Sequence, residues 1–165
     1  MMCYNKYNER AKETKTMMKI WFDMDGTIAD LYAVDGWLEM LRNFDAEVYE
    51  MAKPLCRMCS LARQLNSLQR KGYTIGIISW SSKVSTEEFD EQVRRAKMNW
   101  LAQHLPSVNW DEVQVVPYGT PKHEVCGSGV LFDDEMHNRH EWMKHAGMAF
   151  EPAFISEVLS ELGKC

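Results

Sequence analysis

Four acidic residues occupy two places in the sequence where an apolar run ends. Asp23 and Asp25 follow the run KIWF, and Asp133 and Asp134 follow the run GVLF. A single pair of acids after an apolar run is also typical of a solvated turn. The two pairs therefore indicate a functional site only if the fold brings them together.

The spacing of Asp23 and Asp25 favours a metal site. Residues two apart in an extended segment start their side chains on the same side. Neighbouring carboxylates repel, and one keeps its proton unless a cation intervenes. A hard divalent cation with oxygen ligands suits such a site, and in a cell that ion is Mg²⁺. Asp133 and Asp134 could complete the coordination, one directly and the other through water or by orienting a neighbour.

Carboxylates around a divalent cation are suited to phosphoryl transfer. One of them can attack phosphorus and form an aspartyl-phosphate, while a second acid protonates the leaving oxygen and later deprotonates water. The transferring group also needs donors on its equatorial oxygens. Ser79 and Lys122 are candidates for this role, and Lys83 is a rival to Lys122. Thr27 and the backbone amides near Gly26 could assist.

The elements that would position these residues alternate between strand and helix. Strands are predicted over KIWFD, YTIGIIS, EVQVVP, GVLFDD and GMAF. Helical patterns run from Leu31 to about Ala52, from Leu55 to Gly72, over STEEFDEQVRRAKMNWLAQHL, from Asn138 to His145, and over ISEVLSEL. Ser85 and Glu88 predict a capping box for the third helix.

This alternation predicts an α/β fold, a Rossmann-like three-layer sandwich with a mostly parallel five-stranded sheet. Residues 1–17 are expected to be a tail outside the core. Residues 18–165 would form a single domain with a small helical insert at about 31–55. Ligands of such sheets bind beyond the carboxyl ends of the strands. Asp23, Ser79 and Asp133 with Asp134 all fall at those ends.

Composition narrows the function classes. The chain has 165 residues, is 45% apolar and 26% charged, and carries a net charge of -5, which is typical of one soluble domain. The acidic balance argues against a nucleic acid as the main partner, whereas a small phosphorylated substrate remains compatible. No run is long enough to span a membrane. Five scattered cysteines predict free thiols in the cytoplasm, and CRMC alone favours packing over a zinc or redox role.

The motifs, taken in order, resemble those of the haloacid-dehalogenase-like hydrolase superfamily. An apolar strand followed by DxDGT is matched by FDMDGT, and a strand ending in paired acids is matched by VLFDD. These two motifs are specific. A strand ending in Ser or Thr is matched by IGIIS, and a Lys before the fourth strand by Lys122 in YGTPKHEV, and each of these is weak alone.

The resemblance implies a role for each acid. Asp23 would be the nucleophile and a metal ligand, and Asp25 the general acid/base that ligates the metal through its backbone carbonyl. Asp133 and Asp134 would complete the metal site. An acid two residues after the nucleophile is typical of the superfamily's phosphatases, so the resemblance implies phosphomonoester hydrolysis, with Ser79 and Lys122 holding the phosphate.

A narrower resemblance concerns the substrate. DMDGTIAD, KMNWLAQHLP and LFDD are together similar to the deoxyribonucleotidase branch, which acts on nucleoside monophosphates. Trp80 could then stack on a base or sugar, or simply pack. The residues after the paired acids, His137, Asn138 and His140, could lie near the mouth of the site, but a helix-capping or solvent-facing role is favoured.

The insert after the first motif leaves little chain for a substrate-covering cap. An open site could admit larger phosphoesters, such as nucleic-acid ends or phosphoproteins. Alternatively, the partner subunit of a homodimer could supply the cover. A non-catalytic binding protein with the same fold is a further alternative, although no acid of the motifs is missing.

Overall fold

Five parallel strands form the centre of the molecule. The computed structural model describes residues 18–164, so the predicted tail lies outside the described residues. The strands are ordered β5-β4-β1-β6-β7, and every neighbouring pair is parallel. Their bounds are β1 Lys19–Phe22, β4 Thr74–Trp80, β5 Glu112–Val116, β6 Gly129–Phe132 and β7 Gly147–Phe150. All five predicted strands are present.

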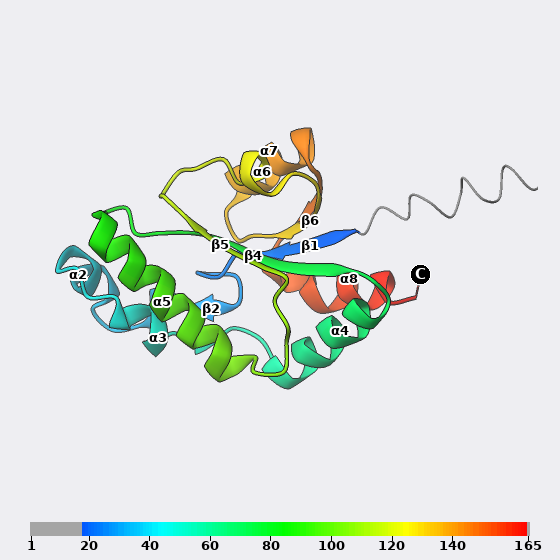
Figure 1. Ribbon diagram of the computed structural model, residues 1–165, viewed down its shortest axis with the longest axis horizontal. Coiled ribbons are helices and arrows are strands. Elements are labelled where there is room, and N and C mark those ends of the chain that lie inside the picture. The colour runs from blue at the N-terminus through cyan, green and yellow to red at the C-terminus, as the bar shows by residue number, and fades with distance from the viewer. Residues whose placement is uncertain (1–17, 165) are drawn as a thin grey trace, which may run out of the picture.

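Helices cover both faces of this sheet, as Figure 1 shows. One face carries α4 Met58–Arg70, α5 Glu87–His104 and α8 Ile155–Leu162, and the other carries α6 Lys122–Cys126 and α7 Met136–His145. The predicted α/β class, a three-layer sandwich around a five-stranded sheet, is confirmed. The short helix α6 was not predicted, although its first residue, Lys122, was singled out.

Alternating side chains of β1 serve the two layers. Ile20 and Phe22 are fully buried in the core beneath α4, α5 and α8, whereas Trp21 is buried among residues of α6 and α7. This is the period of two expected for a strand with both faces covered. The apolar run KIWF is therefore explained by a central strand that is buried on both sides.

The insert after β1 differs from its predicted form. The helical pattern from Leu31 to about Ala52 predicted one long helix, but the segment forms a 3-10 turn and two short helices. Its elements are β2 Ala29–Asp30, η1 Leu31–Ala33, α2 Trp37–Arg42, α3 Glu47–Met51 and β3 Lys53–Pro54. Gly36 and Phe44 adopt φ values of 71° and 56°, and this left-handed backbone cannot continue a right-handed helix.

The insert is closed at its base and packed against α5. Strands β2 and β3 pair antiparallel where the insert leaves and rejoins the main domain. Buried residues of the insert share a core with the first turns of α5. The contributing residues are Leu31, Leu41, Ala46, Val48 and Tyr49 from the insert and Phe89, Val93 and Ala96 from α5.

The cap of α5 lies one residue later than predicted. The Thr86 hydroxyl accepts a hydrogen bond from the Phe89 amide at 3.2 Å, which satisfies one of the free amides of the first turn. Ser85 instead donates its hydroxyl proton to Asp90. The predicted Ser85–Glu88 capping box is therefore wrong, because Ser and Thr are adjacent and the geometry selects Thr.

Two further observations concern membrane-spanning helices and the cysteine thiols. Within residues 18–164, no helix combines the length and apolar character that crossing a membrane requires. Cys56, Cys59 and Cys126 are free cysteines, as the scattered spacing predicted for them.

The packing of β1 against β4 yields a stability prediction. Gly76 lies beside Trp21 in the sheet, and a Cβ at position 76 would overlap the indole ring of Trp21. Gly76→Ala should lower the free energy of unfolding by about 1–3 kcal/mol through overpacking, measured by urea denaturation. In a Trp21→Leu background the same change should cost less, because the ring is gone. An equal cost in both backgrounds would contradict this packing.

Candidate active site

The acids predicted at the strand ends meet there. The Asp23 amide donates to the Phe132 carbonyl at 2.8 Å, and the Asp133 amide donates to the Phe150 carbonyl at 3.2 Å. These bonds extend the sheet ladder up to the acids themselves. Asp23, Asp133 and Asp134 each offer an oxygen within 4.8 Å of the others, although they are about 110 residues apart in the chain.

Lys122 bridges two of these acids. Its ammonium lies 2.9 Å from Asp23 Oδ1 and 2.6 Å from Asp133 Oδ2, and all three side chains are buried. The first residue of α6 thus enters the cluster from the α6 and α7 layer. Its rival Lys83 is exposed, with its ammonium 5.8 Å from the Tyr118 ring centroid. The geometry therefore favours Lys122 at the acid end of the site.

The two acids after β6 have different surroundings. Asp133 accepts hydrogen bonds from Lys122, from the Glu135 amide at 2.9 Å, and from the Asn138 amide group at 3.2 Å to each oxygen. Its oxygens are occupied by protein donors. Within residues 18–164, the side-chain partner of the Asp134 carboxylate is the Thr27 hydroxyl, at a long 3.4 Å. Asp134 is therefore the acid better placed to bind a metal directly.

Gly26 and Thr27 shape the backbone around Asp134. Gly26 adopts a φ of 77°, and a Cβ there would overlap the Asp134 carboxylate, so both the backbone and the close approach require glycine. The Thr27 hydroxyl accepts from the Asp134 amide at 3.1 Å. The Gly26 and Thr27 amides donate to carbonyls of Ala29 and Met24 within the turn. Their predicted contact with phosphate stays a prediction.

Two residues of α7 support the paired acids, and the sequence pattern did not assign them this role. For Asn138 a helix cap or a solvent-facing position was favoured over the mouth of the site, yet it is buried, lines the cavity and holds Asp133. Arg139 donates to the backbone carbonyls of Asp133 and Asp134 at 2.8 and 2.7 Å. His137 and His140 are exposed.

Charge in the cluster is not balanced. Burial, followed by repulsion from Asp23, raises the pKa of Asp133 to about 6. Burial, then repulsion from Asp23 and Asp133, raises the pKa of Asp134 to about 7. Burial opposes the charge of Lys122, but attraction to Asp23 and Asp133 outweighs it and the lysine pKa is raised. One lysine faces three carboxylates, and this electrostatic excess, with an all-oxygen donor set, fits a divalent cation such as Mg²⁺.

Asp25 belongs to a separate contact on the other side of the site. Its Oδ2 lies 2.5 Å from the ammonium of Lys97, which is fully buried on α5. Lys97 also donates to Ser79 Oγ at 2.7 Å and to the Trp80 carbonyl at 2.9 Å. Lys97 is the first residue of the motif KMNWLAQHLP, but the sequence assigned it no role. The available signal was its spacing from Val93 and Trp100, which places a charged residue on the apolar stripe of the helix.

The residues at the end of β4 differ in their access to the cavity. Ser79 is fully buried behind the cavity, where its hydroxyl accepts from Lys97, and its predicted contact with phosphate is untested. Trp80 lines the cavity, and its indole donates to the Thr120 carbonyl at 2.8 Å. Ser81 and Ser82, next along the chain, also line it.

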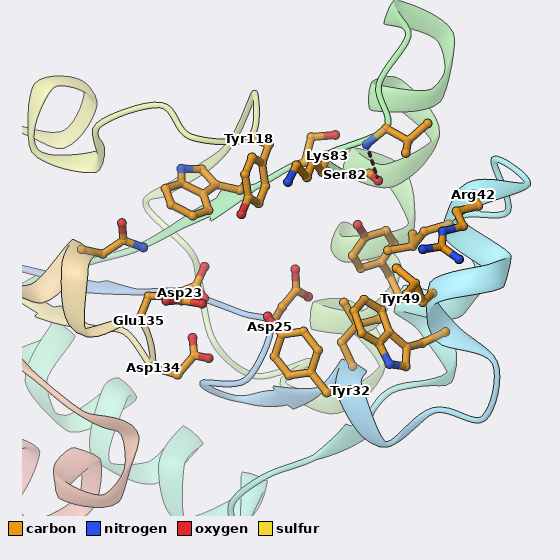
Figure 2. A pocket seen from close by; sticks show the side chains of 18 of the residues that line it. Asp23, Asp25, Tyr32, Arg42, Tyr49, Ser82, Lys83, Tyr118, Asp134 and Glu135 are labelled. Carbon is orange, nitrogen blue, oxygen red and sulfur yellow. Dashed lines mark hydrogen bonds between the residues drawn. The ribbon is translucent and has the colours of Figure 1, made fainter.

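A cavity of about 430 Å³ opens above the acids. Figure 2 shows Asp23 and Asp134 at one end, Asp25 and Tyr32 in the middle, and Tyr49 and Arg42 of the insert at the other. The insert supplies much of the wall despite its small size. Its lining residues are Leu31, Tyr32, Trp37, Leu38, Leu41, Arg42 and Tyr49.

Aromatic side chains form much of this wall. The rings of Tyr32 and Trp37 meet edge to face at 5.2 Å, and those of Trp80 and Tyr118 lie 5.0 Å apart. Together with Tyr49 they present flat apolar surface next to the acidic end. The cavity therefore combines an acidic end suited to a metal-bound phosphate with aromatic walls suited to a flat organic group.

Comparisons with known proteins add a distant structural similarity. No protein-family model matches the chain, and neither does any curated protein sequence. Among solved structures, the chain is similar to a D,D-heptose 1,7-bisphosphate phosphatase from Burkholderia thailandensis, with a TM-score of 0.49 and 12% identity. The match covers 79% of this chain and 74% of that chain. At this level of identity the similarity does not establish an activity.

The raised pKa of Asp134 predicts a pH-dependent cost of the acid cluster. In the folded protein this carboxyl holds its proton up to about pH 7, against a reference pKa of 3.8, so stability present at low pH is lost as pH rises through that window. In EDTA at pH 8, Asp134→Asn should raise the free energy of unfolding by about 1–2 kcal/mol, discounted for partial exposure.

Thermal unfolding from pH 4 to pH 8 measures this effect. The advantage of Asp134→Asn should vanish at pH 4, whereas the control Glu135→Gln, at an exposed neighbour, should change little at either pH. Added Mg²⁺ should stabilise the wild type more than Asp134→Asn. Equal melting temperatures for wild type and Asp134→Asn at pH 8 would contradict the charge imbalance.

Proposed function

We propose that this protein is a Mg²⁺-dependent phosphomonoester hydrolase of the haloacid-dehalogenase-like superfamily. The observation that carries the proposal is the convergence of Asp23, Asp133 and Asp134, from two distant segments, around Lys122 at the end of a cavity. The order of the four sequence motifs agrees with the superfamily, and Asp23, Asp133 and Asp134 follow directly on the ends of β1 and β6.

Asp23 is proposed as the nucleophile. Lys122 holds Asp23 Oδ1 at 2.9 Å, which orients the carboxylate and leaves Oδ2 to attack phosphorus. The same ammonium can donate to an oxygen of the transferring phosphoryl group. Asp134 and Asp23 would hold the metal, with Asp133 orienting Lys122. When bound, Mg²⁺ would offset the negative charge of the phosphate and so weaken its repulsion from the attacking carboxylate.

Asp25 is proposed as the general acid and base. It lines the cavity two residues after the nucleophile, and burial raises its pKa while attraction to Lys97 opposes that shift. A raised pKa suits a carboxyl group that must carry a proton to the leaving oxygen. Asp25 would then take a proton from the water that releases phosphate from Asp23.

We further propose that the substrate is a nucleoside monophosphate. A cytoplasmic location is also proposed, because the described cysteines are free thiols. Five aromatic side chains line the walls of the cavity, and they offer stacking surface to a base. Larger phosphoesters, such as nucleic-acid ends, are the second candidate. The insert speaks against them, because it walls the cavity from within this chain and a volume of about 430 Å³ suits a small molecule.

A phosphate-release assay tests both levels of the proposal. Wild-type protein with Mg²⁺ should hydrolyse p-nitrophenyl phosphate and nucleoside monophosphates. EDTA or Asp23→Asn should reduce the rate by about a thousandfold or more, because the cation or the nucleophile is lost. The matched control Asp35→Asn changes an exposed acid of the insert outside the lining and should keep full activity.

The same assay separates the substrates. Nucleoside monophosphates should be turned over with higher kcat/KM than sugar phosphates or 3'-phosphorylated oligonucleotides. A preference for the oligonucleotides would overturn the nucleotidase proposal but keep the phosphatase. Equal rates for the wild type with Mg²⁺, the wild type in EDTA and Asp23→Asn would overturn the phosphatase proposal itself.

A further inference from the structure

Lys97 is the most constrained charged side chain of the site. It has 0% exposure, and its ammonium meets Asp25 Oδ2 at 2.5 Å, Ser79 Oγ at 2.7 Å and the Trp80 carbonyl at 2.9 Å. An ammonium has three protons to donate, so every donor is used. The ring of Tyr49 lies 4.7 Å from the same nitrogen.

Packing alone does not explain a lysine at this position. Its neighbours on the inner face of α5, Val93 and Trp100, are fully buried apolar residues, and an unbranched apolar side chain would fill the same space. Burying an ammonium costs free energy that its partners only partly return. The reason for the charge must therefore lie in what the ammonium touches.

Lys97 meets the proposed proton transfer through Asp25, whose carboxylate it binds. It is outside the cavity lining, whereas Asp25 lines the cavity in the middle, between Asp23 and Tyr49 (Figure 2). The bonds to Ser79 and Trp80 fix the ammonium to the end of β4, so it forms a rigid point of attachment. Asp25 Oδ2 is held against that point, and Oδ1 is left to face the cavity.

We propose that Lys97 is a positioning residue: it anchors Asp25 Oδ2, so that Oδ1 meets the leaving-group oxygen of the substrate. The proposal rests on the proposed phosphatase function and assigns Lys97 no contact with substrate, metal or phosphate. A displacement of a catalytic group by about 1 Å can cost about a hundredfold in rate. Replacing Lys97 should therefore lower the rate of those reactions that are limited by proton donation from Asp25.

The leaving group makes this role measurable. An alkyl phosphate, such as a nucleoside monophosphate, expels an alkoxide that needs a proton, whereas p-nitrophenyl phosphate expels a stable phenolate that does not. For either substrate, kcat/KM reports only the steps up to transfer of the phosphoryl group to Asp23. Lys97→Met should lower kcat/KM about a hundredfold for the alkyl ester and by less than about fivefold for the aryl ester.

Four further variants complete the experiment. Asp25→Asn and the double variant Asp25→Asn with Lys97→Met should have the same alkyl-ester kcat/KM, because Lys97 acts only through Asp25. Trp100→Phe, a buried substitution on the same helix, is the control for altered packing. It should lower kcat/KM for both esters by the same factor. If circular dichroism shows that Lys97→Met does not fold, Lys97→Gln, which is of similar length and uncharged, replaces it. The same difference in kcat/KM between the two esters is then expected.

The outcomes separate this proposal from the one it rests on. Wild-type turnover of both esters, lost in Asp23→Asn, establishes the phosphatase first. Equal losses on the two esters in the Lys97 variant would then overturn the positioning role alone, as would an additional loss when Lys97→Met is combined with Asp25→Asn. Absence of wild-type turnover would overturn both proposals.

Discussion

Repulsion among carboxylates at the end of a parallel sheet is the constraint on which the rest of this structure depends. Asp23, Asp133 and Asp134 lie within reach of one ion, and only Lys122 among the described residues enters their midst as a cation. The fold tolerates this because the sheet ladder, the Thr27 hydroxyl and the donors of α7 fix each acid in place. Such a cluster is costly for stability and useful for binding a divalent cation.

Two buried lysines reach this edge of the sheet from opposite layers. Lys122 begins α6 on one face, and Lys97 lies within α5 on the other, as Figure 1 allows the reader to follow. Each pairs with a different acid of the DxD motif, Lys122 with Asp23 and Lys97 with Asp25. Separate partners allow two acids only two residues apart to take different roles, since each carboxylate is oriented by its own cation.

The sequence predicted the framework well because its signals are local. Apolar runs gave all five strands, and paired acids at the ends of two of them gave the cluster of Asp23, Asp133 and Asp134. The local pattern failed where a single backbone angle ends a helix. Gly36 and Phe44 have positive φ and break the helix predicted for the insert. It also failed where contacts come from distant elements. Lys97 and Arg139 resemble ordinary helical cations until the fold places them beside Asp25 and the acids after β6.

The most direct test of the central claim is to find the phosphoryl group on the protein. Asp25→Asn mixed with Mg²⁺ and p-nitrophenyl phosphate should still transfer phosphate to Asp23, since this leaving group needs no proton, but should release it slowly. Acid quenching followed by mass spectrometry of peptides should then show a hydroxylamine-sensitive phosphate on Asp23. Phosphate on another residue, or free phosphate released in a burst with none on the protein, would contradict the account.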